Sequence, residues 1–260
     1  MISLYSGTPG SGKSFHATSD VFYRLRNKKN VITNFPISED VVKSSLIDFW
    51  MHKLFKRPYK RDKKRKIGNY TYCTNADLTV DFLKKYAKEN HAGHKEHETL
   101  VVIDECGIMF NPRTFTQADR LEWIQFFSLH RHYGYDFVLI SQSDRMVDRQ
   151  IRSFFEYEHK HRNVGHFKIW GKIMALLMGG SCFIDVTYFY GIREKVTSEF
   201  FRFSHRVADM YDSYLLFDEN GEECTIAAEE NTTEVSGGTA SGGGDPRTSD
   251  GVAILDNSNT

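Results

Sequence analysis

The chain has little of what marks a secreted or membrane-spanning protein. Its 260 residues include only four cysteines and five prolines, and the cysteines form no C-x-x-C pair. This usage favours reduced thiols in a cytosolic protein. The longest uncharged stretch of the C-terminal half, Ile173–Ile184, is too short to cross a membrane as a helix. No secretion signal precedes the first apolar run, Met1–Leu4, so we expect neither export nor a membrane-spanning helix.

The formal net charge is zero, but the charges are unevenly distributed. From Asp209 onward there are twelve acidic side chains and one basic one, Arg247, which leaves residues 1–208 with 33 basic and 22 acidic side chains, a net charge of +11. Such a basic body favours nucleic acid or an anionic membrane surface as a partner. From about Glu222 the chain loses its aromatics and becomes rich in Gly, Ser, Thr and Asn. We therefore predict a folded domain over residues 1–221 and a disordered acidic tail over 222–260.

The most informative motif follows Met1–Leu4 directly. Residues Gly7–Ser14 fit the phosphate-loop pattern G-x-x-x-x-G-K-[ST]. Glycines allow the backbone to fold around phosphate oxygens, and the amides at the start of the next helix face the anion. Lys13 is expected to reach the β- and γ-phosphates of ATP, and Ser14 to offer its hydroxyl to Mg²⁺. The predicted nucleotide-binding residues are Gly7, Thr8, Pro9, Gly10, Ser11, Gly12, Lys13, Ser14 and Phe15.

A second motif fits the same chemistry. The apolar, β-branched run Thr99–Ile103 is typical of a buried parallel strand, and it ends in Asp104 and Glu105. Asp104 is expected to hold Mg²⁺, directly or through water, and Glu105 to polarise the attacking water. A later strand ends in Gln142, a candidate sensor of the γ-phosphate; the alternative is an ordinary polar residue at a strand end. Together the motifs predict a nucleoside triphosphate hydrolase.

The spacing of apolar residues predicts an α/β fold, with a parallel central sheet flanked by helices and a small β-rich C-terminal part. Helices are predicted over residues 15–26, 41–54, 77–90, 119–132 and 148–155. Strands are predicted over residues 30–34, 99–103, 136–142, 154–159, 167–170, 183–192 and 214–217.

Two polar segments carry possible binding functions. Residues 53–66 contain nine basic side chains and one acidic one, interleaved with Phe55 and Tyr59. We interpret this block as an insertion that contacts nucleic acid, phospholipid or an acidic protein; a solvated loop is the alternative. His91, His94 and His97 could suggest a metal site, but the loop has no matching ligand pair, and we expect none there.

The order of the motifs resembles one family. The phosphate loop, Ile103–Cys106 and the block Phe127–Gln142 (F-S-L-H-R-H-Y-G-Y-D-F-V-L-I-S-Q) are similar to the zonula occludens toxin-like family, the filamentous-phage assembly ATPases also called gene I products. The likeness covers roughly residues 1–215. It implies an FtsK–HerA-like P-loop motor that hydrolyses ATP to export single-stranded phage DNA.

The resemblance also implies partners and a location. Family members form ring oligomers, here expected to be hexameric, and work with phage coat and membrane assembly proteins. The expected location is the host cytoplasm, at the cytoplasmic face of the inner membrane. Single-stranded DNA, its binding protein and an anionic membrane surface are further candidate partners. The sequence departs from better-known members, which carry a transmembrane helix after the ATPase domain, so a peripheral role or a separate membrane partner is expected here.

Two questions stay open at the level of sequence. One is the reaction, because a P-loop phosphotransferase and a nucleotide-gated scaffold without hydrolysis share the phosphate loop. The other is the cation that completes the site from a neighbouring subunit, for which Arg131, Arg149 and Arg152 are candidates. We favour Arg131, which lies in the most family-like block; the alternative is an ion pair between Arg131 and a core carboxylate such as Asp136.

Overall fold

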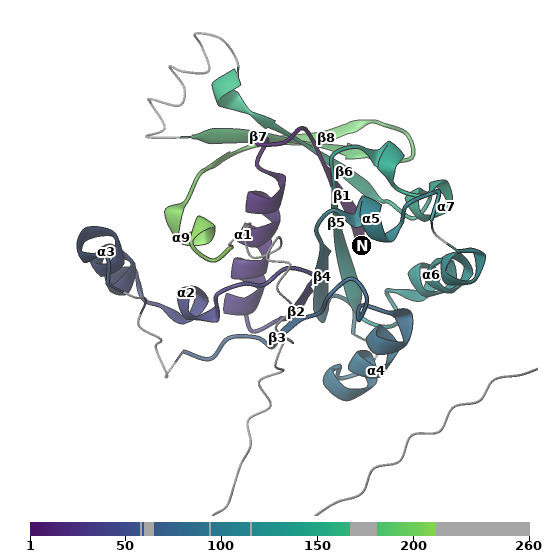
Figure 1. Ribbon diagram of the computed structural model, residues 1–260, viewed down its shortest axis with the longest axis horizontal. Coiled ribbons are helices and arrows are strands. Elements are labelled where there is room, and N and C mark those ends of the chain that lie inside the picture. Colours follow the sequence, from purple (N-terminus) through teal and green to yellow (C-terminus); the bar gives the residue numbers. More distant parts are fainter. Residues whose placement is uncertain (58, 60–64, 94, 115, 167–180, 212–260) are drawn as a thin grey trace, which may run out of the picture. The chain divides into compact units, whose positions relative to one another are not determined.

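The computed structural model describes residues 1–57, 59, 65–93, 95–114, 116–166 and 181–211 (Figure 1). Eight strands form one sheet in the order β3-β2-β4-β5-β1-β6-β7-β8. Neighbours from β3 to β6 are parallel, and β7 and β8 extend the sheet antiparallel. The strands are β1 (Ile2–Ser6), β2 (Asn30–Thr33), β3 (Tyr70–Tyr72), β4 (Thr99–Ile103), β5 (Tyr135–Ser141), β6 (Tyr157–Asn163), β7 (Cys182–Phe189) and β8 (Lys195–Arg202). The prediction of an α/β fold with a parallel central sheet and C-terminal strands is confirmed.

Helices cover both faces of the parallel strands. They are α1 (Lys13–Arg26), α2 (Glu39–Lys43), α3 (Leu46–Phe55), α4 (Val80–Asn90), α5 (Cys106–Met109), α6 (Gln117–Leu129), α7 (Arg149–Arg152) and α9 (His205–Ala208). Strand β4 shows the two-sided burial, since Leu100 and Val102 join the core under α1, whereas Val101 and Ile103 join the core under α4 and α6. Because successive side chains of a strand point to opposite faces, a strand covered on both sides must be apolar throughout.

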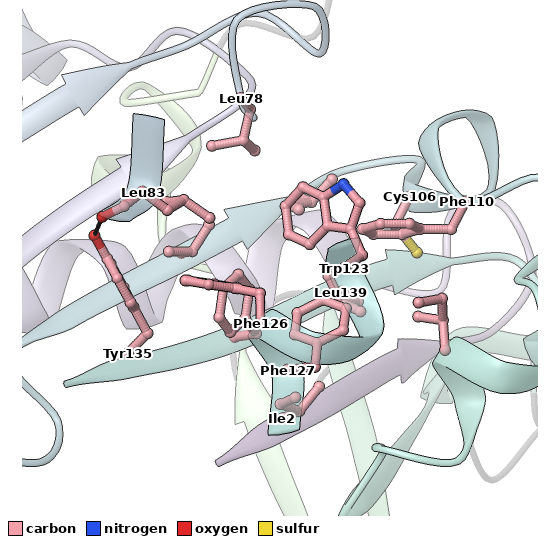
Figure 2. Packing of buried hydrophobic residues seen from close by; sticks show 14 of the residues in the cluster. Ile2, Leu78, Leu83, Cys106, Phe110, Trp123, Phe126, Phe127, Tyr135 and Leu139 are labelled. Atoms are coloured by element: carbon pink, nitrogen blue, oxygen red, sulfur yellow. Dashed lines mark hydrogen bonds between the residues drawn. The ribbon is translucent and has the colours of Figure 1, made fainter. Parts of the chain in front are cut away.

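The core under α4 and α6 is rich in aromatic rings (Figure 2). Trp123, Phe126 and Phe127 of α6 meet at centroid distances of 5.3 to 6.4 Å, and Phe127 also meets Phe137 of β5 edge-on. The Tyr135 hydroxyl donates to the carbonyl oxygen of Leu83 at 2.7 Å, which satisfies a buried polar group. This packing fixes α4 and α6 against the sheet.

Several predicted elements differ from the structure. The helix predicted over 41–54 is two helices, because Ser44 and Ser45 are extended, and Ser45 caps α3 in a capping box with Asp48. Strands β3 and β8 were not predicted. The strands predicted over 167–170 and 214–217, residues 58 and 60–64 of the basic block and the boundary near residue 221 lie outside the described residues. Among the helices of the described residues, none is long and apolar enough to cross a membrane.

Candidate nucleotide site

The phosphate loop connects β1 to α1 at the carboxyl edge of the parallel strands. Gly7, Gly10 and Gly12 adopt positive φ values of 147°, 73° and 94°. Two of them are also sterically required. A Cβ atom on Gly7 would lie 2.6 Å from the carbonyl oxygen of His161, and one on Gly12 would lie 2.7 Å from the ring of Phe183. The loop therefore packs tightly on β6 and β7, and a side chain at either position would displace it.

Lys13 begins α1 and folds back over the loop. Its Nζ donates to the carbonyl oxygens of Gly7 at 2.8 Å and Thr8 at 3.2 Å. Burial lowers the pKa of Lys13, and the charges of Glu105 and Asp104 oppose that shift. The ammonium group is thus held among the loop atoms and lies near two carboxylates. A phosphate oxygen bound there could replace the loop carbonyl oxygens as the acceptor of its hydrogen bonds.

Asp104 follows β4 and joins the phosphate loop to the strand end. Its Oδ2 accepts hydrogen bonds from the Ser14 hydroxyl at 2.9 Å and the Tyr211 hydroxyl at 3.3 Å. Asn34, just after β2, fixes the Asp104 backbone, because its amide donates to the Asp104 carbonyl at 2.8 Å and accepts from the Asp104 N–H at 2.7 Å. No sequence motif assigned a role to Asn34 or Tyr211. The only signal for Asn34 was its position at the carboxyl end of a strand.

Glu105 precedes α5 in the left-handed conformation, with φ 47°. Partial desolvation and the neighbouring Asp104 raise the pKa of Glu105, whereas Lys13 and a hydrogen bond with Gln142 lower it. Gln142 reaches Glu105 because β5 lies between β1 and β4, so its carboxyl end lies between the loop and the Asp104–Glu105 pair. The structure thus brings the predicted loop residues, Asp104, Glu105 and Gln142 to one edge of the sheet.

Arg131 lies elsewhere. It precedes β5 and forms an ion pair with Glu156 at 2.7 Å, and Glu156 precedes the parallel strand β6. Arg131 is therefore at the amino edge, opposite the phosphate loop of its own chain. Arg131 thus forms an ion pair with a carboxylate, as the alternative expected, but the partner is Glu156 and not Asp136, which binds Arg24 at 2.6 Å and His97 at 2.7 Å.

Of the remaining candidates, Phe15, Arg152 and His91 have local partners. Phe15 stacks on Phe203 at a centroid distance of 5.1 Å. Arg152 lies 3.8 Å from Asp144, and Arg149 is exposed at the start of α7. Both ring nitrogens of His91 are engaged, with the Tyr133 carbonyl and the Thr99 hydroxyl at 2.6 Å each, whereas His94 lies outside the described residues.

The residues at the carboxyl edge fit a nucleotide and Mg²⁺. Gly7 and Gly12 leave no room for side chains, and the Ser11 Oγ is buried with no hydrogen-bond partner among the described residues. The Ser14 hydroxyl and the Asp104 carboxylate are oxygen ligands of the kind that Mg²⁺ prefers, and they already face each other. The arrangement can hold a polyphosphate between a cationic loop and an acidic strand end.

Comparisons with known proteins identify the family of the chain. A family model described as Zonular occludens toxin (Zot) matches residues 1–177. The Gene 1 protein of Enterobacteria phage I2-2 is 28% identical over 106 residues, which cover 39% of this chain and 29% of that protein. The Gene 1 protein of Enterobacteria phage fd is 31% identical over 75 residues, which cover 29% of this chain and 22% of that protein. The matched part thus spans less than a third of either phage protein.

A solved structure supports the fold independently. It is an ATPase domain that is 10% identical to this chain in sequence. The superposition covers 81% of this chain and 84% of that domain, with a TM-score of 0.52. At this identity the likeness concerns the fold, which is that of a P-loop ATPase. Because the family model covers more than half of the chain, and includes the phosphate loop, Asp104, Glu105 and Gln142, the chain belongs to the Zot family.

Proposed function

We propose that the chain hydrolyses Mg²⁺-ATP as a motor for filamentous phage assembly and for export of single-stranded phage DNA. The observation that carries the hydrolytic part is the 2.9 Å hydrogen bond from Ser14 to Asp104, with Glu105 directly next to it. This contact joins the phosphate loop to a strand end that offers both a magnesium ligand and a base. ATP turnover in the absence of any acceptor would distinguish this hydrolase from a phosphotransferase.

Each residue has a distinct role in this proposal. The loop amides from Gly7 to Ser14 and the Lys13 ammonium bind the phosphates, and Ser14 and Asp104 hold Mg²⁺, which would neutralise charge developing on the phosphate oxygens. Glu105 orients and polarises the attacking water. Gln142 holds the Glu105 carboxylate and lies where it can sense the γ-phosphate. Asn34 and Tyr211 position Asp104 through the hydrogen bonds described above.

The assembly role is supported by membership of the Zot family and by the likeness to phage Gene 1 proteins. It includes a ring of identical subunits, hexameric in the simplest form, that works with coat and membrane assembly proteins at the cytoplasmic face of the host inner membrane. DNA or its binding protein passes through this ring.

An anionic membrane surface is the partner we propose for α3. Ile47, Trp50 and Leu54 project at helical spacing and are 74%, 55% and 67% exposed, and Lys53 lies over the Trp50 ring at 5.5 Å. Lys56 and Arg57 follow directly. Exposed apolar side chains beside several cations are the pattern of a helix that lies in a membrane interface.

The hydrolytic role is tested by measuring ATP turnover and nucleotide binding separately. Lys13→Ala should abolish turnover, and Glu105→Gln should lower the rate by roughly 10²–10⁴ while nucleotide binding is kept, since a positioned base contributes about that much. Glu199→Gln, on the exposed strand β8, is the matched control and should leave the rate unchanged. Binding without turnover in the wild type would instead favour a nucleotide-gated scaffold. A Glu105→Gln variant that hydrolyses ATP at the rate of the wild type would contradict the role of Glu105.

A further inference from the structure

A cluster of potential metal ligands lies behind the phosphate loop, apart from the proposed Mg²⁺ site. It consists of His16 in the first turn of α1, His161 of β6 and Asp185 of β7. One ligand atom from each of these residues lies within 4.8 Å of the others. His161 and Asp185 are opposite residues of the antiparallel β6–β7 pair, so their side chains share one face of the sheet. They are 2% and 3% exposed, and His16 of α1 lies over them half-buried.

We propose that His16, His161 and Asp185 bind a divalent transition-metal ion of the zinc class. The donor set of two imidazoles and one carboxylate suits Zn²⁺ or Co²⁺, whereas Mg²⁺ prefers oxygen ligands alone. A fourth, solvent-derived ligand would complete a tetrahedral site on the half-buried side of His16.

The protonation of the histidines fits this role. The Nδ1 of His161 donates to the carbonyl oxygen of His159 at 3.0 Å, so its Nε2 carries the lone pair. This is the backbone contact that commonly orients a metal-binding histidine. The Nδ1 of His16 lies 2.7 Å from that Nε2 and therefore donates to it.

A bound metal ion would replace the proton that lies between the His16 Nδ1 and the His161 Nε2. His16 would carry its proton on Nε2 instead of Nδ1, so that both facing nitrogens present lone pairs. Metal–nitrogen distances of about 2.0–2.1 Å at a tetrahedral angle place the two nitrogens about 3.3 Å apart. The rings need to separate only slightly from their 2.7 Å contact.

Within the described part of the chain, the buried Asp185 carboxylate has one oxygen with hydrogen-bond partners and one without. Its Oδ2 accepts from the His159 Nδ1 at 2.7 Å and from the Thr187 hydroxyl at 3.3 Å. Its Oδ1 is buried and has no hydrogen-bond partner among the described residues. A buried carboxylate oxygen without a partner is costly, and a cation between Asp185 and the two histidines would satisfy it. His159 would then support the ligand from behind, as carboxylate ligands are usually supported.

The position of the site has a structural consequence. The ion would tie the first turn of α1, three residues after Lys13, to β6 and β7. The His161 carbonyl already touches Gly7, since a Cβ there would come within 2.6 Å of it. The bound ion would therefore hold the helix start and the back of the phosphate loop together. This role does not depend on ATP hydrolysis.

The test is metal binding by the whole chain after it has been stripped with a chelator. Titration with Co²⁺ should produce the intense visible absorption of a four-coordinate site at one ion per chain. Zn²⁺ should displace Co²⁺, raise the thermal midpoint and resist excess Mg²⁺. Asp185→Asn and His161→Ala should each weaken binding by at least about tenfold. His132→Ala, at an exposed histidine, is the matched control and should bind as the wild type does.

A measurement on the wild type guards against variants that fail to fold. Crystals soaked in Zn²⁺ should show anomalous scattering between His16, His161 and Asp185. An anomalous peak only elsewhere, no binding at micromolar free Zn²⁺, or binding that a folded Asp185→Asn or His161→Ala variant retains in full would each overturn the proposal.

Discussion

At the scale of single residues, the pair Glu105 and Gln142 determines how the proposed base behaves with pH. Gln142 hydrogen-bonds Glu105 and lowers the pKa of its carboxyl group, against partial desolvation and Asp104, which raise it. The net pKa of Glu105 is above its ordinary value. A general base works only when it is ionised, so the ATPase rate should fall on the acidic side with a midpoint above the usual glutamate range.

Gln142→Ala should move this acidic midpoint to higher pH. Without the hydrogen bond the charged form of Glu105 loses a stabilising contact, so its pKa rises and less of it is ionised at a given pH. The measurement is the pH dependence of kcat for the wild type and the variant. Gln117→Ala, at the exposed start of α6, is the control. An unshifted midpoint with a lower rate would mean that Gln142 acts on the γ-phosphate and not through Glu105.

Asp136 controls stability at the opposite edge of the sheet. It is 1% exposed and accepts from Arg24 at 2.6 Å and from His97 at 2.7 Å. Burial alone would raise its pKa, but His97, the N-terminal ammonium and Arg24 together outweigh burial and hold the pKa below the ordinary value. A carboxyl group with a depressed folded-state pKa stabilises the fold above its unfolded-state pKa, and that contribution is lost as pH falls through the folded-state pKa.

Asp136→Asn should therefore lower the free energy of unfolding near pH 7 by about 1.5–3 kcal/mol, the range for hydrogen bonds to charged groups. The difference from the wild type should shrink as the pH is lowered into the acid range. Urea unfolding at several pH values measures both effects. Asp81→Asn, at an exposed position of α4, should show neither. An undiminished difference in acid would show that shape, and not charge, makes Asp136 stabilising.

At the scale of elements, the sequence predicted best where burial is two-sided. The strand Thr99–Ile103 is apolar throughout and was predicted with its correct bounds. Strand β8 was missed because most of its side chains are exposed, so it shows no buried face. The helix predicted over 41–54 was wrong at Ser44. There the chain is held open by Arg26, Arg65 and Arg206, which all donate to the Ser44 carbonyl oxygen. These long-range contacts have no local signature.

The exposed apolar side chains of α3 lead us to predict binding to anionic membranes. Trp50→Ser with Leu54→Ser should weaken binding of the full chain to anionic phospholipid vesicles, because two exposed apolar side chains no longer enter the interface. Binding should also fall with salt, since Lys53, Lys56 and Arg57 contribute through charge. Vesicle sedimentation measures both effects.

The control for this prediction is Leu121→Ser, because Leu121 is exposed to a similar extent, 57%, but lies on α6. It should bind vesicles as the wild type does. Equal binding by the α3 double variant and the wild type would remove the membrane from the proposed partners of α3. If the wild type binds neutral vesicles as strongly as anionic ones, charge does not contribute to the binding.

At the scale of the whole molecule, the site combines parts that sequence reasoning found and parts that it missed. The phosphate loop and Asp104–Glu105 carry local patterns because their chemistry fixes both residue type and spacing. The contacts of Gly7 with His161 and of Gly12 with Phe183 join residues far apart in the chain, and no local pattern encodes them. The same holds for Tyr211, which reaches Asp104 from beyond α9. Distant segments that close over a motif become visible only in the fold.

The proposed ring makes the last prediction. Arg131 lies at the amino edge of the sheet with its side chain 53% exposed, so it can reach a phosphate loop only in a neighbouring subunit. Such a cation would stabilise the negative charge that spreads over the γ-phosphate oxygens. Arg131→Ala and Lys13→Ala proteins should each be inactive alone. When mixed, they should regain part of the ATPase activity, because some interfaces then pair an intact loop with an intact arginine.

The ion pair with Glu156 requires a control, since losing it could weaken the fold and so abolish activity indirectly. Arg131→Lys can keep a charge opposite Glu156, but it lacks the planar fork that binds phosphate oxygens through two donors. It should therefore keep the thermal midpoint near that of the wild type while losing most activity. The same mixing test applies to Arg149, which is exposed, and to Arg152, which lies 3.8 Å from Asp144. If mixed assemblies form and none of the three pairs recovers activity, the neighbouring subunit does not supply an arginine, and the shared site is wrong even if Lys13 and Glu105 act as proposed.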